Sequence, residues 1–504
     1  MAIRTVEQYK KSIRDDRVVY FRGEKIKDVT EHPFMKITVS QMALDYIVAN
    51  DPKYKDLFLD KDESGEEMRF LHRPERSTED LLRRRKIVQL MARMGFGIPG
   101  GSNTTGKDAL NAIAVVCDRM DRQNGSHYRE RVEGYRKHVL KDDPAVIGAV
   151  TDIKGDRSLR PSKQVPHQDY YVHVVDRNKD GIFVSGAKAH ISLAPCANEM
   201  ICIPCRRHRE EDKDYAVVFS VPCNAKGITM ISTDHEIDNI ENSFDYPYSS
   251  SIFFADAIVI FDNVFIPNEN VFMDGEWKYS GDMAYAFGNS HRLFADSYKY
   301  VELEILAGAA FLIAEYNGLE RVPHVQDKLA WLTMYCEAEE AMAEQACVKP
   351  VREPGSDLVY PNPLYSNIAK FFFADNYHQA IKNVQDIAGG LVCTIPSSKD
   401  FFNPETRELM EKYLSGKHGI PTEHRMRAFR LIKDLTSAWH STLTIHGEGS
   451  LATQRMSILA LAASLMIRPK FEALFIALWV SLWSVGCMFL LMRVAAAWKE
   501  AFGG

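Results

Sequence analysis

The sequence predicts an α+β protein in which helical regions flank a central β-rich region. Apolar residues recur at helical spacing before residue 145 and again after residue 279, whereas residues 145–278 alternate short apolar runs with turn residues. The chain has 504 residues, 46% hydrophobic and 26% charged, which is typical of a folded globular protein and excludes a mostly disordered one. We expect a helical domain over 1–144, a β domain over 145–278 and a helical bundle over 279–470.

The first region contains two predicted helices. One begins near Thr78, with acidic residues in its first turn, and continues through Met91. The second follows a glycine-rich break and runs from about residue 108 to 120. The basic run 83–86 on the first helix has two interpretations, a site for the phosphates of a cofactor or substrate and a solvated helix face.

The central region consists of short runs that are rich in β-forming residues. Asp180–Gly181 separates two of these runs and is a strong hairpin signal. No helix of ordinary length fits here, so we expect a barrel-like β domain. The predicted strands are 170–175, 181–185, 200–203, 215–221 and 258–261.

The last region returns to long helical patterns, over residues 301–316, 325–349, 376–388 and 422–445. A final apolar helix is expected over 471–504. Within it, Ala473–Met492 is a run of uncharged residues that is long enough to span a bilayer. This run is either a membrane anchor or a helix buried in an oligomer interface, and we favour the interface.

Charge and cysteine content narrow the class of protein further. Lys and Arg total 62 and Asp and Glu total 68, so the chain has no excess of basic residues. The charge therefore gives no indication of a nucleic-acid partner. The 9 cysteines are scattered, and the first residues lack the apolar core of a signal peptide. We therefore expect a cytoplasmic protein with reduced thiols, the alternative being one tethered by its apolar helix. A spacing that resembles a metal-binding motif is formed by Cys196, Cys202, Cys205 and His208. These residues fall around a predicted strand, so we expect no metal there.

Several motifs occur in a specific order over residues 5 to 455, and together they resemble one family of flavoproteins. That family contains 4-hydroxyphenylacetate 3-hydroxylase and 4-hydroxybutyryl-CoA dehydratase and has the acyl-CoA dehydrogenase-like fold, helices, then β, then helices. Residues 151–157 and 105–109 are closer to the dehydratase branch, and a Gly-Arg-Ser/Thr-Pro-Asp run usual in the monooxygenases is missing near 105–109. The motifs are 20–24, 148–157, 186–190, 261–267 and 419–422.

The resemblance implies FAD as cofactor and a homotetramer or homodimer. In relatives the segment 151–157 and a hydroxyl residue at the position of Ser192 lie against the flavin, and a Gly-Gly helix end approaches FAD from a neighbouring subunit. The residues alone would favour a charged surface turn and an ordinary glycine cap. The implied cofactor contacts are Thr151, Lys154, Asp156, Arg157, Ser192, Gln385, Gly389 and Gly390.

The resemblance also implies catalytic residues. His291 matches a histidine that in the dehydratase ligates a [4Fe-4S] cluster and is a suspected base, and a neutral imidazole can accept an acidified C–H proton. Lys299 matches a family active-site lysine, and Asp256 replaces a family glutamate. Ser192 keeps the hydroxyl of its position. Without the family, His291 would be interpreted as a helix-entry histidine with local hydrogen bonds.

The cluster itself is not expected. The three cysteine positions of the dehydratase hold Gly100, Thr104 and Tyr298, which cannot supply thiolates to iron. A family tyrosine falls on Ala295 and a glutamate on Leu443.

Three functions follow from this pattern. The first is a FAD-dependent lyase or isomerase acting on a short acyl-CoA, similar to 4-hydroxybutyryl-CoA dehydratase and vinylacetyl-CoA Δ-isomerase. The second is a monooxygenase that hydroxylates a phenol with reduced FAD from a separate flavin reductase. The third is a paralogue that has lost catalysis.

Overall fold

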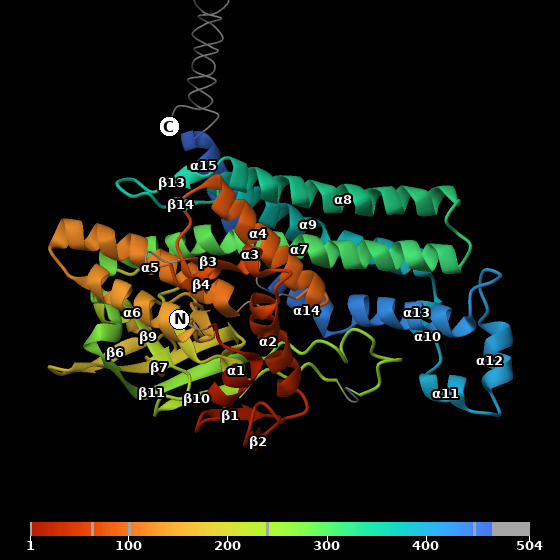
Figure 1. The fold of residues 1–504 in the computed structure, drawn as a ribbon, viewed down its shortest axis with the longest axis horizontal. Coiled ribbons are helices and arrows are strands. Elements are labelled where there is room, and N and C mark those ends of the chain that lie inside the picture. The colour runs from red at the N-terminus through yellow and green to blue at the C-terminus, as the bar shows by residue number, and fades with distance from the viewer. Residues whose placement is uncertain (1–2, 62–64, 99–101, 238–240, 447–449, 466–504) are drawn as a thin grey trace, which may run out of the picture. The chain divides into compact units, whose positions relative to one another are not determined.

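The computed structural model describes residues 3–61, 65–98, 102–237, 241–446 and 450–465 (Figure 1). They form an α+β fold, which confirms the predicted class. The described residues up to 446 belong to one compact unit, and α15 (Leu451–Leu465) belongs to a second. The division into three domains at 144, 278 and 470 stays a prediction.

The β region consists of two open sheets. The larger has the order β2 (Glu24–Lys25), β1 (Val18–Phe21), β10 (Ile228–Ser232), β11 (Asp256–Pro267), β7 (Gly181–Ser192) and β6 (His173–Arg177). The smaller has the order β12 (Val271–Asp274), β9 (Val217–Pro222), β8 (Glu199–Cys202) and β5 (Val146–Ala149). Two-stranded ribbons are formed by β3 (Leu59–Lys61) with β4 (Glu67–Arg69) and β13 (Val351–Arg352) with β14 (Val359–Tyr360).

The expectation of a barrel-like domain is wrong for the described residues. β2 and β6 are free edges of the larger sheet, and β12 and β5 are edges of the smaller one. The helical N-terminal region also contributes β1, which pairs in parallel with β10 more than 200 residues later, through Val18 and Thr229. A pairing between such distant segments leaves no local signal.

The predicted hairpin is confirmed. β6 and β7 are antiparallel, and the side chain of Asn178 accepts hydrogen bonds from the backbone of Asp180 at 2.8 Å and Gly181 at 3.0 Å. β7 continues to Ser192 and pairs along most of its length with β11. The carboxyl end of β7 and the amino end of β11 thus lie side by side, with Ser192 opposite Asp256.

Six helices precede the strands of the smaller sheet. The helix α4 begins at Thr78, near the predicted start. Its N-cap is Ser77, whose side chain accepts a hydrogen bond from Asp80 N. α5 starts at Ser102 rather than near residue 108. The helices are α1 (Val6–Ser12), α2 (Met35–Asn50), α3 (Lys55–Phe58), α4 (Thr78–Met94), α5 (Ser102–Asn124) and α6 (Tyr128–Asp142).

The C-terminal helices include three long ones, which lie side by side in Figure 1. The predicted helix 422–445 is two helices, because Ala438 is extended, with φ −99° and ψ −173°. This break turns Trp439 away from the preceding helix axis. The helices are α7 (Ser280–Tyr316), α8 (Pro323–Val348), α9 (Pro363–Ala388), α10 (Leu391–Thr394), α11 (Ser398–Phe402), α12 (Arg407–Tyr413), α13 (Thr422–Ser437) and α14 (Trp439–His446).

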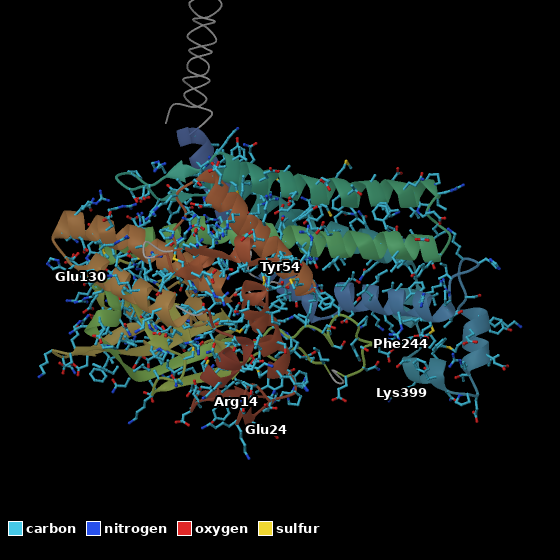
Figure 2. All side chains as sticks on the ribbon, in the orientation of Figure 1. Arg14, Glu24, Tyr54, Glu130, Phe244 and Lys399 are labelled. Atoms are coloured by element: carbon cyan, nitrogen blue, oxygen red, sulfur yellow. The ribbon has the colours of Figure 1, made fainter. Side chains whose placement is uncertain are left out.

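Side chains fill the space between these elements (Figure 2). Two residues of the basic run on α4 belong to this packing, which corrects the interpretation of the run as a solvated face for Arg84 and Arg85, whereas Lys86 is exposed. Arg84 is fully buried against Asp108 and Glu75, and Arg85 pairs with Glu340. Arg83 donates to the carbonyl of Leu57 at 2.9 Å.

The described helices include none that is both long and apolar enough to cross a membrane. The uncharged run Ala473–Met492 lies outside the described residues.

Candidate functional site

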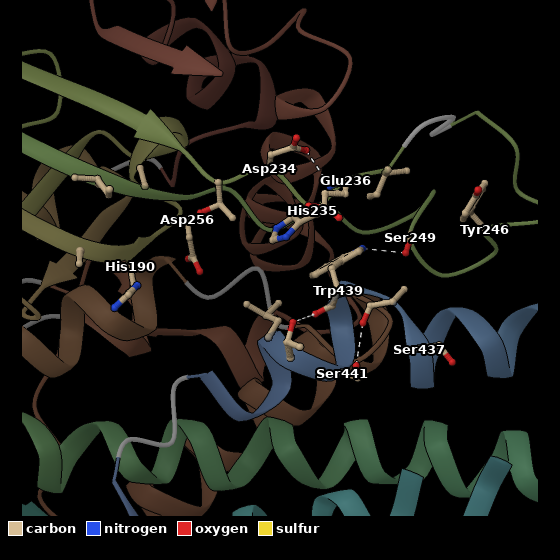
Figure 3. Close-up of a pocket in the computed structure, with 18 of the residues that line it drawn as sticks. His190, Asp234, His235, Glu236, Tyr246, Ser249, Asp256, Ser437, Trp439 and Ser441 are labelled. Atoms are coloured by element: carbon tan, nitrogen blue, oxygen red, sulfur yellow. Dashed lines mark hydrogen bonds between the residues drawn. The ribbon is translucent and has the colours of Figure 1, made fainter. Parts of the chain in front are cut away.

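A cavity of about 950 Å³ opens between the edge of the larger sheet and the helices α13 and α14 (Figure 3). Its sheet side comes from the ends of β7, β10 and β11, and its helix side from the α13–α14 break. Both apolar and hydrogen-bonding side chains face it. The lining residues are Ile153, Ala189, His190, Thr233–Ile237, Tyr246, Ser249, Asp256–Ile258, Ser437–Trp439 and Ser441–Leu443.

Asp256 is the buried acid of this cavity, with 5% of its surface exposed. Burial raises the pKa of Asp256 from 3.8 to about 7, and a hydrogen bond with Ser192 opposes that rise. A carboxyl with a pKa near neutrality can both release and take up a proton under ordinary conditions. Of the predicted catalytic residues, Asp256 is the one that lines the cavity, and Ser192 contacts it.

A flat aromatic surface forms one wall. The His235 ring stacks on Trp439 with centroids 4.2 Å apart and planes inclined by 22°. His235 Nε2 donates to the carbonyl of Phe254 at 2.9 Å, and burial lowers the pKa of His235. Trp439 Nε1 donates to the Ser249 hydroxyl at 2.9 Å (Figure 3). The stack is therefore anchored at both ends.

The segment 151–157 runs along β7 and only borders the cavity. The carbonyl of Thr151 accepts from Ala189 N at 2.8 Å, and Lys154 N donates to Tyr170 O at 3.0 Å. Ile153 is its one residue in the lining. Asp156 and Arg157 are exposed, and Asp156 accepts from Ser158 N at 2.9 Å in a turn.

His190, the last residue of the motif 186–190, faces the cavity. Its φ is 55°, in the left-handed region, and it lies beside Lys154. Burial lowers the pKa of His190, and the charge of Lys154 adds to this effect. Glu236, across the cavity, has a φ of 54°. Such strained residues are often found at functional sites.

His291 lies on α7, and it is absent from the cavity lining. Its Nδ1 is 2.9 Å from Oδ2 of Asp108, a fully buried residue that also contacts Arg84 and accepts from the Ser290 hydroxyl. Burial alone would raise the pKa of Asp108, but Arg84 and His291 lower it below its ordinary range. Because the anionic Asp108 accepts a hydrogen bond from Nδ1–H, Nε2 is the basic nitrogen of His291.

Aromatic rings continue along the same face of α7. The His291 ring stacks on Phe287 with ring centroids 4.9 Å apart, and its centroid is 5.4 Å from that of Phe294. Tyr298, at a cysteine position of the dehydratase, is 5.1 Å from Phe294. Thr104, at another such position, is buried, and Gly100 lies outside the described residues.

Lys299 belongs to a buried polar network behind α14. Its Nζ donates to Thr444 O at 2.5 Å and pairs with Glu302 at 3.0 Å. Glu302 lies 3.8 Å from His440 Nε2, which is 2.9 Å from the Tyr248 hydroxyl. α14 separates this network from the cavity, since Trp439 and Leu443 line the cavity whereas His440 and Thr444 contact the network.

The predicted Gly-Gly end of α9 is also outside the cavity lining. Gln385 Nε2 donates to Thr436 Oγ1 at 3.1 Å, next to Ser437 in the cavity wall. Gly389 has φ 78° and is exposed, as is Gly390. Open space above this end fits an approach by another molecule.

No group of three or more metal-binding side chains occurs among residues that the structure describes. Cys196 and Cys202 are buried, as expected for cysteines of a packed β region, and burial raises the pKa of Cys196 to about 12. Cys205 and His208 lie near Asp152.

Sequence reasoning missed several residues of the site. His235 and Trp439 were not singled out, although the cluster Asp234–Glu236 and the Trp439–His440 pair are unusual local compositions that could have been noticed. Asp108 could not be found, because it reaches His291 from 183 residues away.

The fold is shared with solved structures of two enzymes. An oxygen-tolerant archaeal 4-hydroxybutyryl-CoA dehydratase from N. maritimus matches with a TM-score of 0.85 and 31% identity over 91% of this chain and 92% of that chain. The oxygenase component (HpaB) of 4-hydroxyphenylacetate 3-monooxygenase, complexed with FAD, matches with a TM-score of 0.84 and 25% identity over 96% and 99%. The fold is therefore of the acyl-CoA dehydrogenase-like class predicted from the sequence.

The family follows from the sequence comparisons. The signatures "4-hydroxyphenylacetate 3-hydroxylase N terminal" and "4-hydroxyphenylacetate 3-hydroxylase C terminal" match residues 5–273 and 280–465. This chain belongs to the 4-hydroxyphenylacetate 3-hydroxylase family.

Two relatives of this chain are named for different reactions. The 4-hydroxybutyryl-CoA dehydratase/vinylacetyl-CoA-Δ-isomerase of Clostridium aminobutyricum is 32% identical over 476 residues, 90% of this chain and 95% of its own. The oxygenase component of 4-hydroxyphenylacetate 3-monooxygenase of Thermus thermophilus is 29% identical over 422 residues, 83% and 85%.

Proposed function

We propose that this protein is a FAD-dependent enzyme that isomerises a short, unsaturated acyl-CoA by moving a proton, and that it works without an iron–sulfur cluster. The observation that carries the proposal is the buried Asp256 in the wall of a cavity between sheet and C-terminal helices. The dehydratase/isomerase relative, at 32% identity over 90% of this chain, supports the acyl-CoA class.

The cavity fits a flavin. Its volume of about 950 Å³ is within the range of cofactor sites, and the His235–Trp439 stack offers a flat wall for a planar ring. Hydroxyls of Ser441 and Thr442 face the same space. We assign the ring to this cavity, beside Thr151, Lys154 and Ser192, and the adenosine half to Asp156 and Arg157 or, from a neighbouring subunit, to Gln385, Gly389 and Gly390. When bound, FAD supplies the redox-active ring system of the site.

Two groups of the chain can carry the proton. In a β,γ-unsaturated thioester the α-proton is acidified by the carbonyl and by the double bond, so a base of near-neutral pKa suffices to remove it. His291, with Nδ1 held by Asp108, is the proposed base and accepts that proton at Nε2. Because His291 lies outside the lining of the Asp256 cavity, the acyl chain has to extend beyond that cavity to reach it. Asp256 in its protonated form returns a proton to the γ-carbon, and the double bond moves into conjugation. Lys299 acts as a positioning residue, because it holds the carbonyl of Thr444 on α14.

The residues at the three cysteine positions favour isomerisation over dehydration, the two reactions in the name of the dehydratase relative. Removing an unactivated hydroxyl from the acyl chain needs help for the leaving group. Gly100, Thr104 and Tyr298 offer no thiolate to hold a cluster for that purpose. The isomerisation, which needs only proton transfer, is therefore the proposed reaction.

A phenol monooxygenase is the second candidate. It is favoured by the match to the FAD complex of HpaB over 96% of this chain and by the missing cluster ligands. In that case the partner would be a flavin reductase.

The test begins with the visible spectrum of the purified protein and then compares two assays. We expect bound FAD and crotonyl-CoA formation from vinylacetyl-CoA without added reductase. Oxygen uptake with a phenol, NADH and a flavin reductase, together with no isomerase activity, would replace this proposal with the monooxygenase. Inactivity in both assays and no flavin would indicate a paralogue that has lost catalysis. We propose a cytoplasmic homotetramer or homodimer, to be checked by light scattering without detergent.

A further inference from the structure

A second cavity, of about 560 Å³, lies outside the site described above. It is open to solvent and is lined by residues of α1, α2, the loop before α2, the end of α4 and the turn that follows Ser249. Figure 2 labels Arg14, one of its residues. The residues that matter to the argument below are Lys10, Arg14, Lys36, Gln41, Phe96 and Ser250.

Three buried polar atoms, on residues that line this cavity, have no hydrogen-bond partner among the described residues. They are Nε2 and Oε1 of Gln41, which is 6% exposed, and Oγ of Ser250. Buried polar atoms are nearly always paired in folded proteins, so three such atoms at one cavity point to a ligand with hydrogen-bonding groups. A side-chain amide presents a donor beside an acceptor, which is the arrangement that pairs with the edge of adenine.

An aromatic ring and positive charge accompany the amide. Phe96 is 57% exposed and is held at φ 54°, an uncommon conformation for a large side chain. An exposed ring of this kind can stack on a nucleobase. Lys10 and Lys36 make no ion pair with residues that the structure describes, whereas Arg14 pairs with Asp28 at 3.2 Å and with Glu31. The two lysines therefore supply uncompensated charge suited to a phosphate.

The turn 249–251 forms a common wall of the two cavities. Ser249 lines the first cavity, whereas Ser250 and Ser251 line the second. Since consecutive Cα atoms are about 3.8 Å apart, the residues that line the two cavities are adjacent in this turn. A ligand with one reacting end and one nucleotide end could occupy both.

We propose that the second cavity binds the 3′-phosphoadenosine end of the acyl-CoA, with Gln41 on the adenine edge, Phe96 on its face and Lys10 and Lys36 on phosphate. This assignment rests on the proposed acyl-CoA function and extends it to the location of the nucleotide. Adenosine also occurs in FAD, so the test includes FAD.

The experiment uses the full-length protein with its bound flavin and measures binding of adenosine 3′,5′-bisphosphate, CoA and dephospho-CoA by calorimetry. The Lys10→Ala/Lys36→Ala variant should bind adenosine 3′,5′-bisphosphate and CoA at least tenfold more weakly, with less effect on dephospho-CoA, and should keep its FAD. Gln41→Met should weaken binding of all three. Lys137→Ala/Lys141→Ala, which removes two exposed lysines of α6, is the matched control and should bind as the wild type does.

The results separate the site from the function. Failure of the wild type to bind the bisphosphate, equal binding by both double variants, or loss of FAD in place of CoA affinity would each overturn the assignment. Isomerase activity with an unchanged KM for vinylacetyl-CoA in Lys10→Ala/Lys36→Ala would reject the site while the function stands. Bisphosphate binding that requires the two lysines, without turnover of vinylacetyl-CoA, would support the site while the function fails.

Discussion

At the scale of single residues, the site depends on groups whose protonation is set by their surroundings. Burial raises the pKa of Asp256 to about 7, whereas Asp108, also buried, stays anionic because Arg84 lies against it. Two aspartates of one protein thus have opposite pKa shifts. The first can exchange a proton with a ligand, and the second can hold His291 in one orientation.

Asp256 should make the stability of the protein depend on pH. Its pKa is 3.8 when unfolded and about 7 when folded, so the folded state binds more protons between these values. Stability from this group is therefore full below about pH 4 and falls as the pH rises to about 7. Asp256→Asn should remove this decline, as measured by urea unfolding of the flavin-free protein from pH 4.5 to 8. Identical slopes in wild type and variant would contradict the shift.

Asp108 should matter both for folding and for His291. Asp108→Asn removes one of the two buried anionic partners of Arg84, Glu75 being the other, which should cost up to about 3–5 kcal/mol of unfolding free energy. If the folded variant is assayed, isomerase activity should fall by about 10²–10⁴-fold, with a changed pH profile. Asp282→Asn is the control, since its ion pair with Arg119 at 3.0 Å is solvent-exposed and should contribute about 0–1 kcal/mol.

At the scale of elements, breaks and ends of helices place the functional groups. The extended Ala438 separates α13 from α14 and brings Trp439 to the cavity, while the next residue, His440, contacts the buried network with Glu302. One side of α14 therefore lines the cavity, and another side contacts the buried network of Lys299. The C-terminal end of α9 depends on one glycine in the left-handed region.

Gly389 and Gly390 offer a matched pair of substitutions at that end. Gly389 has φ 78° and ψ −170°, a conformation that is essentially restricted to glycine, whereas Gly390 has φ −59° and ψ −23°. Gly389→Ala should cost about 1–3 kcal/mol of stability. Gly390→Ala should be close to neutral. A thermal shift of similar size in both variants would argue against the assigned backbone strain, and FAD content in each variant tests contact with the cofactor.

At the scale of the whole molecule, the first cavity lies between two parts of the fold, the sheet edge and the C-terminal helices. A ligand that binds there contacts both parts and only in the folded state. Cofactor binding should therefore stabilise residues 1–447 as a unit. The candidate site therefore needs both the ends of the sheet strands and the C-terminal helices.

FAD should raise the melting temperature of the flavin-free protein in a concentration-dependent way. At a free concentration of about 100 times Kd, the expected stabilisation is about 2.7 kcal/mol. Differential scanning fluorimetry against FAD, with riboflavin as the control that lacks phosphate and adenosine, would measure it. An unchanged melting temperature would contradict cofactor binding. Iron analysis of the same preparation should give less than one atom per chain.

Local signals in the sequence determined the element types, the hairpin at Asp180–Gly181 and the order of helices and strands. They did so because helix periodicity, capping and turn residues act over a few positions. The family motifs likewise determined the family. Tertiary structure decided the rest, namely the open sheets, the parallel pairing of β1 with β10, the Asp108–His291 contact and the cavity wall at Trp439. These features join segments that are distant in the chain, and their geometry and pKa values arise from burial that no single segment produces.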